Sequence, residues 1–358
     1  RQSLLEKLLV ATDMALSVDA AVEAEVFPLL DSLRHPANFY ENNALARACA
    51  HLATRYRELA ATPATAKSGS WLSCNRRPEM PRNFAAAKAL IFAMFPASQL
   101  SGSYYGSSPD QDQIEDSTSD AVLDSAVAYF SQPAPSPADL QLMQMSGLTP
   151  DCLYMVLGRR ALARFAYQQA ARAWGHVSDS FWSREPFQTY LGANPFSGYL
   201  LDAHKPTADD TVRYTAYQFA LKMTELAQQA HGGDPAGAAK AYYLMGLGAY
   251  NMSYFGNSWL LVRRSWSSAE MTYDFGKPEQ PTDSLNYYST LRAGAYFDSA
   301  LTRTTDPELA ARICFMAARC EQNAFYQYAA RQDVLDVVQQ RDWGYGSGAR
   351  RDSIKTAM

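Results

Sequence analysis

The residue types best suited to metal binding and catalysis are scattered along this sequence. Its five histidines are His35, His51, His176, His204 and His231, and no two of them have the spacing of metal ligands on one helix. The sequence contains no HExxH zinc motif, no GxSxG nucleophile turn, and no phosphate-binding loop of the GxxxxGKS, GxxxxGKT or GxGxxG type. We therefore expect no catalytic residue, no metal site and no cofactor.

The cysteines and the paired acids do not predict a reactive centre either. The cysteines are Cys49, Cys74, Cys152, Cys314 and Cys320, an odd number without a CxxC pair. Cys314 and Cys320 are six residues apart in one predicted helix, so they point to different faces and cannot share a disulfide or a metal ion. We expect small buried thiols. The pairs Glu115-Asp116 and Asp209-Asp210 fall in predicted loops or helix starts, where capping and solvation account for them.

Composition narrows the class of protein. The chain has 358 residues, of which 47% are hydrophobic, and a formal net charge of −4. This balance is typical of a folded soluble protein, and without a basic excess we expect no nucleic-acid partner. No run of about 18 apolar residues occurs, so we expect no transmembrane segment. The first residue is Arg1 and not Met, which leaves open a missing lipid anchor or membrane association through partners.

Most of the sequence has the pattern of amphipathic helices. Apolar residues recur at three and four positions in segments rich in Ala, Leu, Arg, Glu and Gln, and alternating strand-like segments are nearly absent. The sequence therefore predicts an all-α fold. The predicted helices cover residues 2–17, 20–33, 38–61, 83–95, 118–131, 150–177, 211–231, 235–254, 284–302 and 307–331.

A proline-rich segment separates two parts of this pattern. Residues 132–138 (QPAPSPA) have alternating prolines, which favour a stiff, extended spacer. The sequence thus predicts an N-terminal helical region over 1–131, a joint over 132–138, a helical repeat region over 139–340 and a Gly/Arg-rich tail over 341–358.

Two segments of the second part resemble each other. Asp234-Pro235 and Asp306-Pro307 each begin a predicted helix, with Asp as the cap and Pro at the first helical position. Their alignment pairs Tyr243 with Phe315, Gly246 with Ala318, and Asn251 with Asn323, so we expect equivalent places in two repeats. In the second copy an apolar stripe is predicted to face the core; it consists of Leu309, Ile313, Met316, Ala317, Cys320 and Ala324.

These residues resemble a tetratricopeptide (TPR) pattern. Tyr154, Leu157-Gly158 and Ala161, followed by Ala170 and Trp174, keep the spacing of one helix pair. The stretches AYNMSYFGNSW and AARICFMAARCEQN are similar to TPR-like proteins of the Bacteroidetes cell envelope. The resemblance implies a TPR-like helical solenoid with long loop insertions. It also implies a non-enzymatic scaffold or protein-binding subunit in a multi-subunit assembly for secretion, motility or surface display.

Aromatic residues provide the predicted binding surface. The chain has 22 Tyr, 16 Phe and 6 Trp, and they are densest between Tyr242 and Trp266. Most must fill the layers between helices, and we expect a few at the helix end to stay partly exposed. The predicted partner-binding residues are Tyr242, Tyr254, Phe255, Trp259 and, from an arginine cluster, Arg159. Two alternatives remain, a SusD-like glycan-binding outer-membrane lipoprotein and an all-helical enzyme without a recognisable motif.

Overall fold

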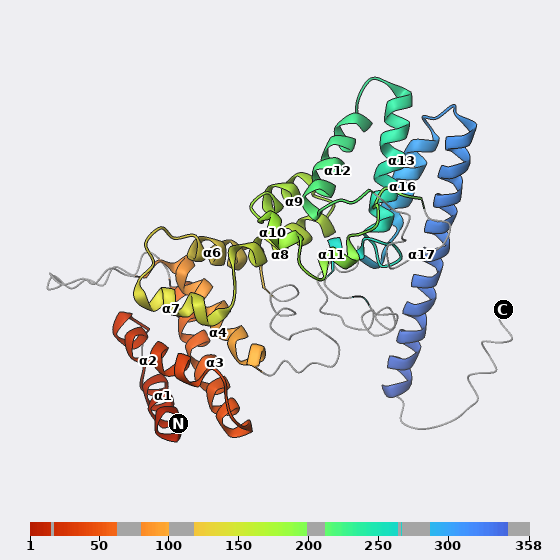
Figure 1. Cartoon of the computed structure of the whole chain (residues 1–358). Coiled ribbons are helices and arrows are strands. Elements are labelled where there is room, and N and C mark those ends of the chain that lie inside the picture. The colour runs from red at the N-terminus through yellow and green to blue at the C-terminus, as the bar shows by residue number, and fades with distance from the viewer. Residues whose placement is uncertain are drawn as a thin grey trace. The chain divides into compact units, whose positions relative to one another are not determined.

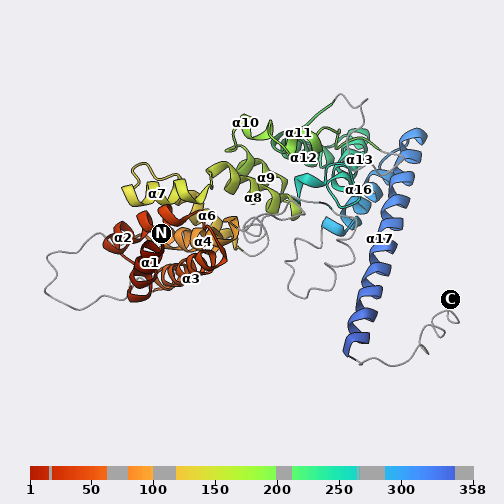
Figure 2. The same ribbon diagram turned by 60° about the horizontal axis from the view of Figure 1, so that its bottom comes forward.

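The structure is a computed structural model, shown in two views in Figures 1 and 2. It describes residues 1–15, 18–62, 80–99, 118–198, 212–263, 266 and 287–342; of residues 95–99 and 326–342 it describes the backbone alone. Every regular element in these ranges is a helix, which confirms the predicted all-α class. The chain divides into two compact units, Arg1–Gly158 with Arg172–Phe181, and Arg159–Ala171 with Trp182–Met358.

The first unit packs its helices around one hydrophobic core. Its helices are α1 (Gln2–Met14), α2 (Ala20–Leu33), α3 (Phe39–Ala61), α4 (Arg82–Gln99), α6 (Asp120–Phe130) and α7 (Pro137–Ser146). Helices α3 and α4 lie side by side in both views. The segment 132–138 lies inside this unit, and its last two residues already belong to α7. There Ser136 and Asp139 form a capping box with Pro137 at the first helical position.

Three helices contribute to both units. They are α8 (Pro150–Ala163), α9 (Tyr167–Trp174) and α10 (Asp179–Trp182). The second unit continues with α11 (Phe187–Tyr190), α12 (Ala216–Ala230), α13 (Pro235–Asn251), a short 3-10 helix η2 (Trp259–Leu261), α16 (Leu291–Leu301) and α17 (Pro307–Asp342). Helix α16 packs on both α13 and α17. As predicted, Asp234 and Asp306 cap α13 and α17, each accepting hydrogen bonds from backbone amides at the helix start.

A buried lysine lies at the centre of the first unit. Lys88 on α4 is 2% exposed, and its Nζ lies 2.5 Å from Glu23 Oε1 on α2 and 2.7 Å from Asp139 Oδ1 on α7. Tyr56 on α3 donates to the same Glu23 oxygen, and Tyr129 on α6 donates to the same Asp139 oxygen. The rings of Tyr56 and Tyr129 also lie within 5.8 Å of the ammonium. Side chains from five helices thus meet at one cation.

The surroundings of this cation determine which groups of the cluster are charged. Burial alone would raise the pKa of Asp139, but hydrogen bonds from Lys88 and Ser136 and the charge of Lys88 hold it below its ordinary value. Burial and the nearby carboxylates raise the pKa values of Tyr56 and Tyr129, so both phenols stay protonated and donate. The Lys88 ammonium therefore lies between two buried acidic side chains, Glu23 and Asp139, and each of these also accepts a hydrogen bond from a tyrosine.

We expect Lys88→Met to lower the free energy of unfolding by about 3–5 kcal/mol, because the remaining carboxylates would be buried without their cation. Urea unfolding followed by circular dichroism measures this loss. Lys222→Met is the control, since Lys222 pairs with Glu225 in a solvent-accessible position. Similar losses in the two variants would contradict a central role for Lys88. Adding Glu23→Gln and Asp139→Asn to Lys88→Met should restore part of the stability.

Stability should also depend on pH through Asp139. Its folded pKa is depressed, so its contribution is present above the unfolded value of about 3.9 and is lost as pH falls through the lower folded value. Asp139→Asn should therefore be less stable than the wild type at neutral pH, with a difference that narrows below about pH 4. Urea titrations at several pH values between about 2 and 7 measure this difference. A difference that stays constant over that range would contradict the assignment.

In the second unit a glycine allows two helices to approach closely. A methyl group at Gly246 on α13 would lie 2.5 to 2.8 Å from three carbons of the Phe297 ring on α16, which is closer than side chains pack. Phe297 is fully buried. Gly246 therefore leaves room for the Phe297 ring between the two helices.

We expect Gly246→Ala to lower the free energy of unfolding by about 1–3 kcal/mol through overpacking, although alanine is the better helix former. Gly294→Ala is the matched control on α16, because its added methyl group would meet only Cys320 Cβ, at an ordinary 3.8 Å. That variant should be neutral or more stable by up to about 1 kcal/mol. Thermal melts of both variants test the pair, and equal effects would show that the Phe297 contact does not limit the packing.

One helix boundary differs from the sequence prediction for a clear local reason. The predicted helix 150–177 is two helices, because Phe165 adopts a left-handed backbone with φ 58°. Phe165 N donates to Leu162 O at 2.8 Å and Ala166 N donates to Ala161 O at 2.9 Å, the two bonds of a Schellman motif. Glycine is the usual residue at this position, so the sequence carries no signal for the break. The sequence also missed α7 and placed the end of α17 eleven residues before Asp342, where the helix ends.

The repeat alignment holds only in part. Tyr243 is half-buried against Phe297, with ring centroids 6.0 Å apart, whereas Phe315 is 40% exposed. The predicted equivalence of these two aromatics is wrong, because α13 is covered on more sides than α17. The apolar stripe of α17 does face inward, with Ile313, Met316 and Cys320 buried. Ala317, which was expected to be buried, is half-buried at the edge of that stripe.

Candidate functional groove

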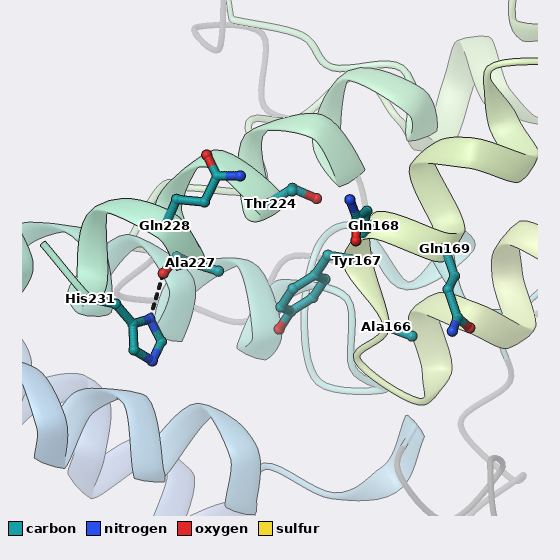
Figure 3. Close-up of a pocket in the computed structure, with 8 residues that line it drawn as sticks. All are labelled: Ala166, Tyr167, Gln168, Gln169, Thr224, Ala227, Gln228 and His231. Carbon is teal, nitrogen blue, oxygen red and sulfur yellow. Dashed lines mark hydrogen bonds between the residues drawn. The ribbon is translucent and has the colours of Figure 1, made fainter.

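The second unit contains an open groove of about 600 Å³ between α9 and α12. Figure 3 shows the residues that line it: Ala166, Tyr167, Gln168, Gln169, Thr224, Ala227, Gln228 and His231. One wall is formed by Ala166 and the first three residues of α9, and the other by three residues in the C-terminal half of α12 and its C-cap His231. The volume is in the range of small-molecule and peptide sites.

Local backbone geometry forms both walls of the groove. The turn at Phe165 ends α8, and the next four residues enter α9 and line one wall. On α12 the lining residues Thr224, Ala227, Gln228 and His231 have the spacing i, i+3, i+4 and i+7, which places them on one helix face. Residues in the first turn of α9 thus lie opposite a stripe of α12.

No carboxylate, ammonium or guanidinium group is among the residues that line the groove. Gln168, Gln169 and Gln228 are exposed, and each carboxamide both donates and accepts hydrogen bonds. Tyr167 is 7% exposed, and its hydroxyl lies 3.2 Å from the Tyr296 hydroxyl on α16. Burial and the neighbouring Tyr296 raise the pKa of Tyr167, so this phenol stays neutral. The wall therefore offers hydrogen-bond donors and acceptors from uncharged carboxamide and hydroxyl groups.

His231 at the end of α12 has a defined orientation. Its Nδ1 lies 2.7 Å from the backbone oxygen of Ala227, which is the dashed contact in Figure 3. Because a carbonyl oxygen only accepts, this bond assigns the proton to Nδ1 and leaves Nε2 of the neutral ring as an acceptor. The same bond satisfies a carbonyl in the last turn of the helix. The ring is exposed, and its centroid lies 6.4 Å from that of Tyr242 on α13.

Three aromatic residues of the predicted binding surface lie inside the protein. Tyr254, Phe255 and Trp259 are 7%, 8% and 5% exposed, so their predicted exposure is wrong. The segment after α13 folds inward, where Tyr254 N donates to Tyr287 O at 2.9 Å and Trp259 contacts Tyr190 with ring centroids 5.2 Å apart. Because these aromatic rings pack against one another, they are buried and do not present a surface to a partner.

The other two predicted binding residues have different positions. Arg159 is 4% exposed, and its guanidinium carbon lies 5.9 Å from the centre of the Phe187 ring, so it does not have the exposed position that a partner-binding arginine needs. Tyr242 is half-buried and lies beside His231, next to the groove. The structure thus brings one predicted residue near the groove.

The histidines, cysteines and acidic residues considered in the sequence do not come together as metal ligands in the part of the chain that the structure describes. Among the residues that the structure describes, no three His, Cys, Asp or Glu side chains gather in the way that a metal ion requires. Cys49 and Cys320 are buried free thiols, and burial raises the pKa of Cys320 to about 12, but Cys314 is exposed, contrary to expectation. Cys74, His204 and both acid pairs lie outside the described residues. His176 stacks on Tyr154, with ring centroids 4.5 Å apart.

In the described ranges, none of the helices combines the length and apolar character of a membrane span. No family model matches the chain, and comparison with curated proteins and with solved structures found no match.

Sequence reasoning missed the groove. The spacing of Thr224, Ala227, Gln228 and His231 shows that they share a face of a helix. Nothing in the sequence shows that this face lies opposite α9, because the turn that places α9 there is formed by a phenylalanine and not by a glycine. An uncharged polar stripe on a helix is also a weak signal, since most such stripes only face solvent.

Proposed function

We propose that this chain is a non-enzymatic, protein-binding subunit that holds an extended segment of a partner in the groove between α9 and α12. The observation that carries the proposal is the lining of the groove by uncharged side chains that form hydrogen bonds. Carboxamides such as Gln168 and Gln169 match the donors and acceptors of a peptide backbone, and the Nε2 of His231 can accept from a peptide N–H. A binding segment would thus be recognised through its main chain.

The proposed subunit is a TPR-like solenoid that belongs to a larger assembly. A TPR-like solenoid is supported by Gly158, since a methyl group there would lie 2.2 Å from an indole atom of Trp174. The indole also donates to Met155 O at 3.1 Å. The small residue and the aromatic of the resembled helix pair therefore pack on each other. We propose a multi-subunit assembly of the cell envelope as the setting, and this part rests on the sequence resemblance.

A glycan is the second candidate for the groove, and the lining disfavours it. Sugar sites commonly present the exposed face of an aromatic ring, but Tyr167 packs edge to face with Phe165 and is 7% exposed. Among the lining residues only His231 presents an exposed ring. An enzymatic role is disfavoured because the groove lining places no carboxylic acid or thiol with this ring.

Panning the protein against a random linear peptide library on phage tests the proposal. We expect the enriched peptides to bind the wild type and to lose about tenfold or more in affinity for Ala227→Trp, because the indole would fill the groove. Gln229→Trp is the matched control, since it puts the same ring on an exposed neighbour outside the lining. A thermal melt verifies that both variants are folded.

The proposal fails if no peptide is enriched, or if the enriched peptides bind Ala227→Trp as tightly as they bind the wild type. A parallel array of neutral oligosaccharides addresses the second candidate. Binding of a sugar that Ala227→Trp abolishes, together with no enriched peptide, would identify the groove as a glycan site.

A further inference from the structure

Two arginines, Arg292 at the start of α16 and Arg303 just after its end, lie near different walls of the groove. Arg292 places its guanidinium carbon 5.1 Å from the centre of the Phe165 ring, and Phe165 in turn contacts the lining residue Tyr167. Arg303 lies 4.8 Å from the centre of the Tyr242 ring, which is next to the lining residue His231. Each arginine is therefore one aromatic ring away from a different wall of the groove.

Neither guanidinium is neutralised. Both side chains are exposed, and Arg303 donates to Ser299 O and Thr302 Oγ1. In the described part of the structure neither arginine forms an ion pair, whereas Arg312 on the next helix pairs with Glu308 at 3.0 Å. Planar guanidinium groups held against aromatic rings are suited to pairing with carboxylates.

The spacing of the two arginines matches an extended chain. They are eleven residues apart: Arg292 lies in the first turn of α16, and Arg303 lies two residues after its end, in a turn where Arg303 N donates to Ala300 O. At the rise and rotation of a helix, eleven residues correspond to about 16 Å and to nearly the same face. Tyr296 lies between them on that face, and it contacts both Tyr167 and Tyr242. An extended peptide rises about 3.3 Å per residue, so about five residues would span this distance.

We propose that the partner segment is acidic and carries two carboxylates about four to six residues apart in an extended chain. One carboxylate would pair with Arg292 and the other with Arg303. This inference rests on the proposed function, since it specifies the segment that occupies the groove. The carboxamide walls bind the main chain, and the two arginines select its charge and its register. Exposed charges of this kind act mainly on selectivity and on the rate of encounter.

Fluorescence polarisation with two synthetic peptides tests the proposal. One labelled peptide carries two glutamates about five residues apart in a sequence of Ser, Thr and Gln, and its isostere has glutamine at both places. We expect the acidic peptide to bind the wild type about tenfold more tightly at low salt, with a smaller difference at about 300 mM NaCl. The double variant Arg292→Gln, Arg303→Gln should lose this difference and bind the glutamine peptide as the wild type does.

Arg312→Gln is the control for a general effect of charge, because it removes a positive charge from the next helix and not from beside the groove. It should keep the preference for the acidic peptide. Equal binding of the two peptides to the wild type, or an acidic preference that survives the double variant, would overturn the acidic partner and leave the proposed groove intact. If tetragalacturonate binds in an arginine-dependent way and neither peptide does, the anionic partner is a glycan and the peptide proposal is overturned.

Discussion

The left-handed backbone of Phe165 is the constraint on which the groove depends. A non-glycine residue in this conformation costs about 1–2 kcal/mol, and here two Schellman hydrogen bonds and the contacts of its ring offset that cost. Had α8 continued straight through Phe165, the next turn would not line a groove opposite α12. The same ring also contacts Tyr167 and Arg292, so one residue both turns the chain and connects the groove to α16.

The two units obtain their specificity from different interactions. In the first unit the Lys88 ammonium is bonded to helices α2 and α7 and surrounded by rings from their neighbours, and only the native arrangement satisfies all of these groups at once. Such a buried ion pair adds little net stability compared with apolar residues, but breaking it is costly. In the second unit α13 and α16 approach closely at Gly246 because the missing side chain leaves room for the Phe297 ring, without an ion pair at that contact.

The sequence predicted the parts of this fold that depend on local signals. The helical class, most helix starts and the caps of Asp234 and Asp306 follow from residue type and spacing within a few positions. Contacts between distant segments could not be predicted in this way. Lys88 looks like any lysine in an Ala-rich helix, and its burial depends on Glu23 and Asp139, which are 65 and 51 residues away along the chain. The groove was missed for the same reason, since its two walls are more than fifty residues apart.

The high aromatic content between Tyr242 and Trp266 serves the interior of the protein, whereas the sequence analysis assigned part of it to a binding surface. Residues 252–262, directly after α13, are mostly irregular and yet all buried, so their polar groups need partners inside the protein. Asn251 Nδ2 donates to Pro195 O and Ser197 O, and Asn323 Nδ2 donates to the Tyr250 hydroxyl. The rings exclude water around these bonds and make them stronger than they would be at the surface. Tyrosine is frequent here because its ring fills space while its hydroxyl accepts such a bond, and this structural demand explains the dense window without a binding role for Tyr254, Phe255 or Trp259.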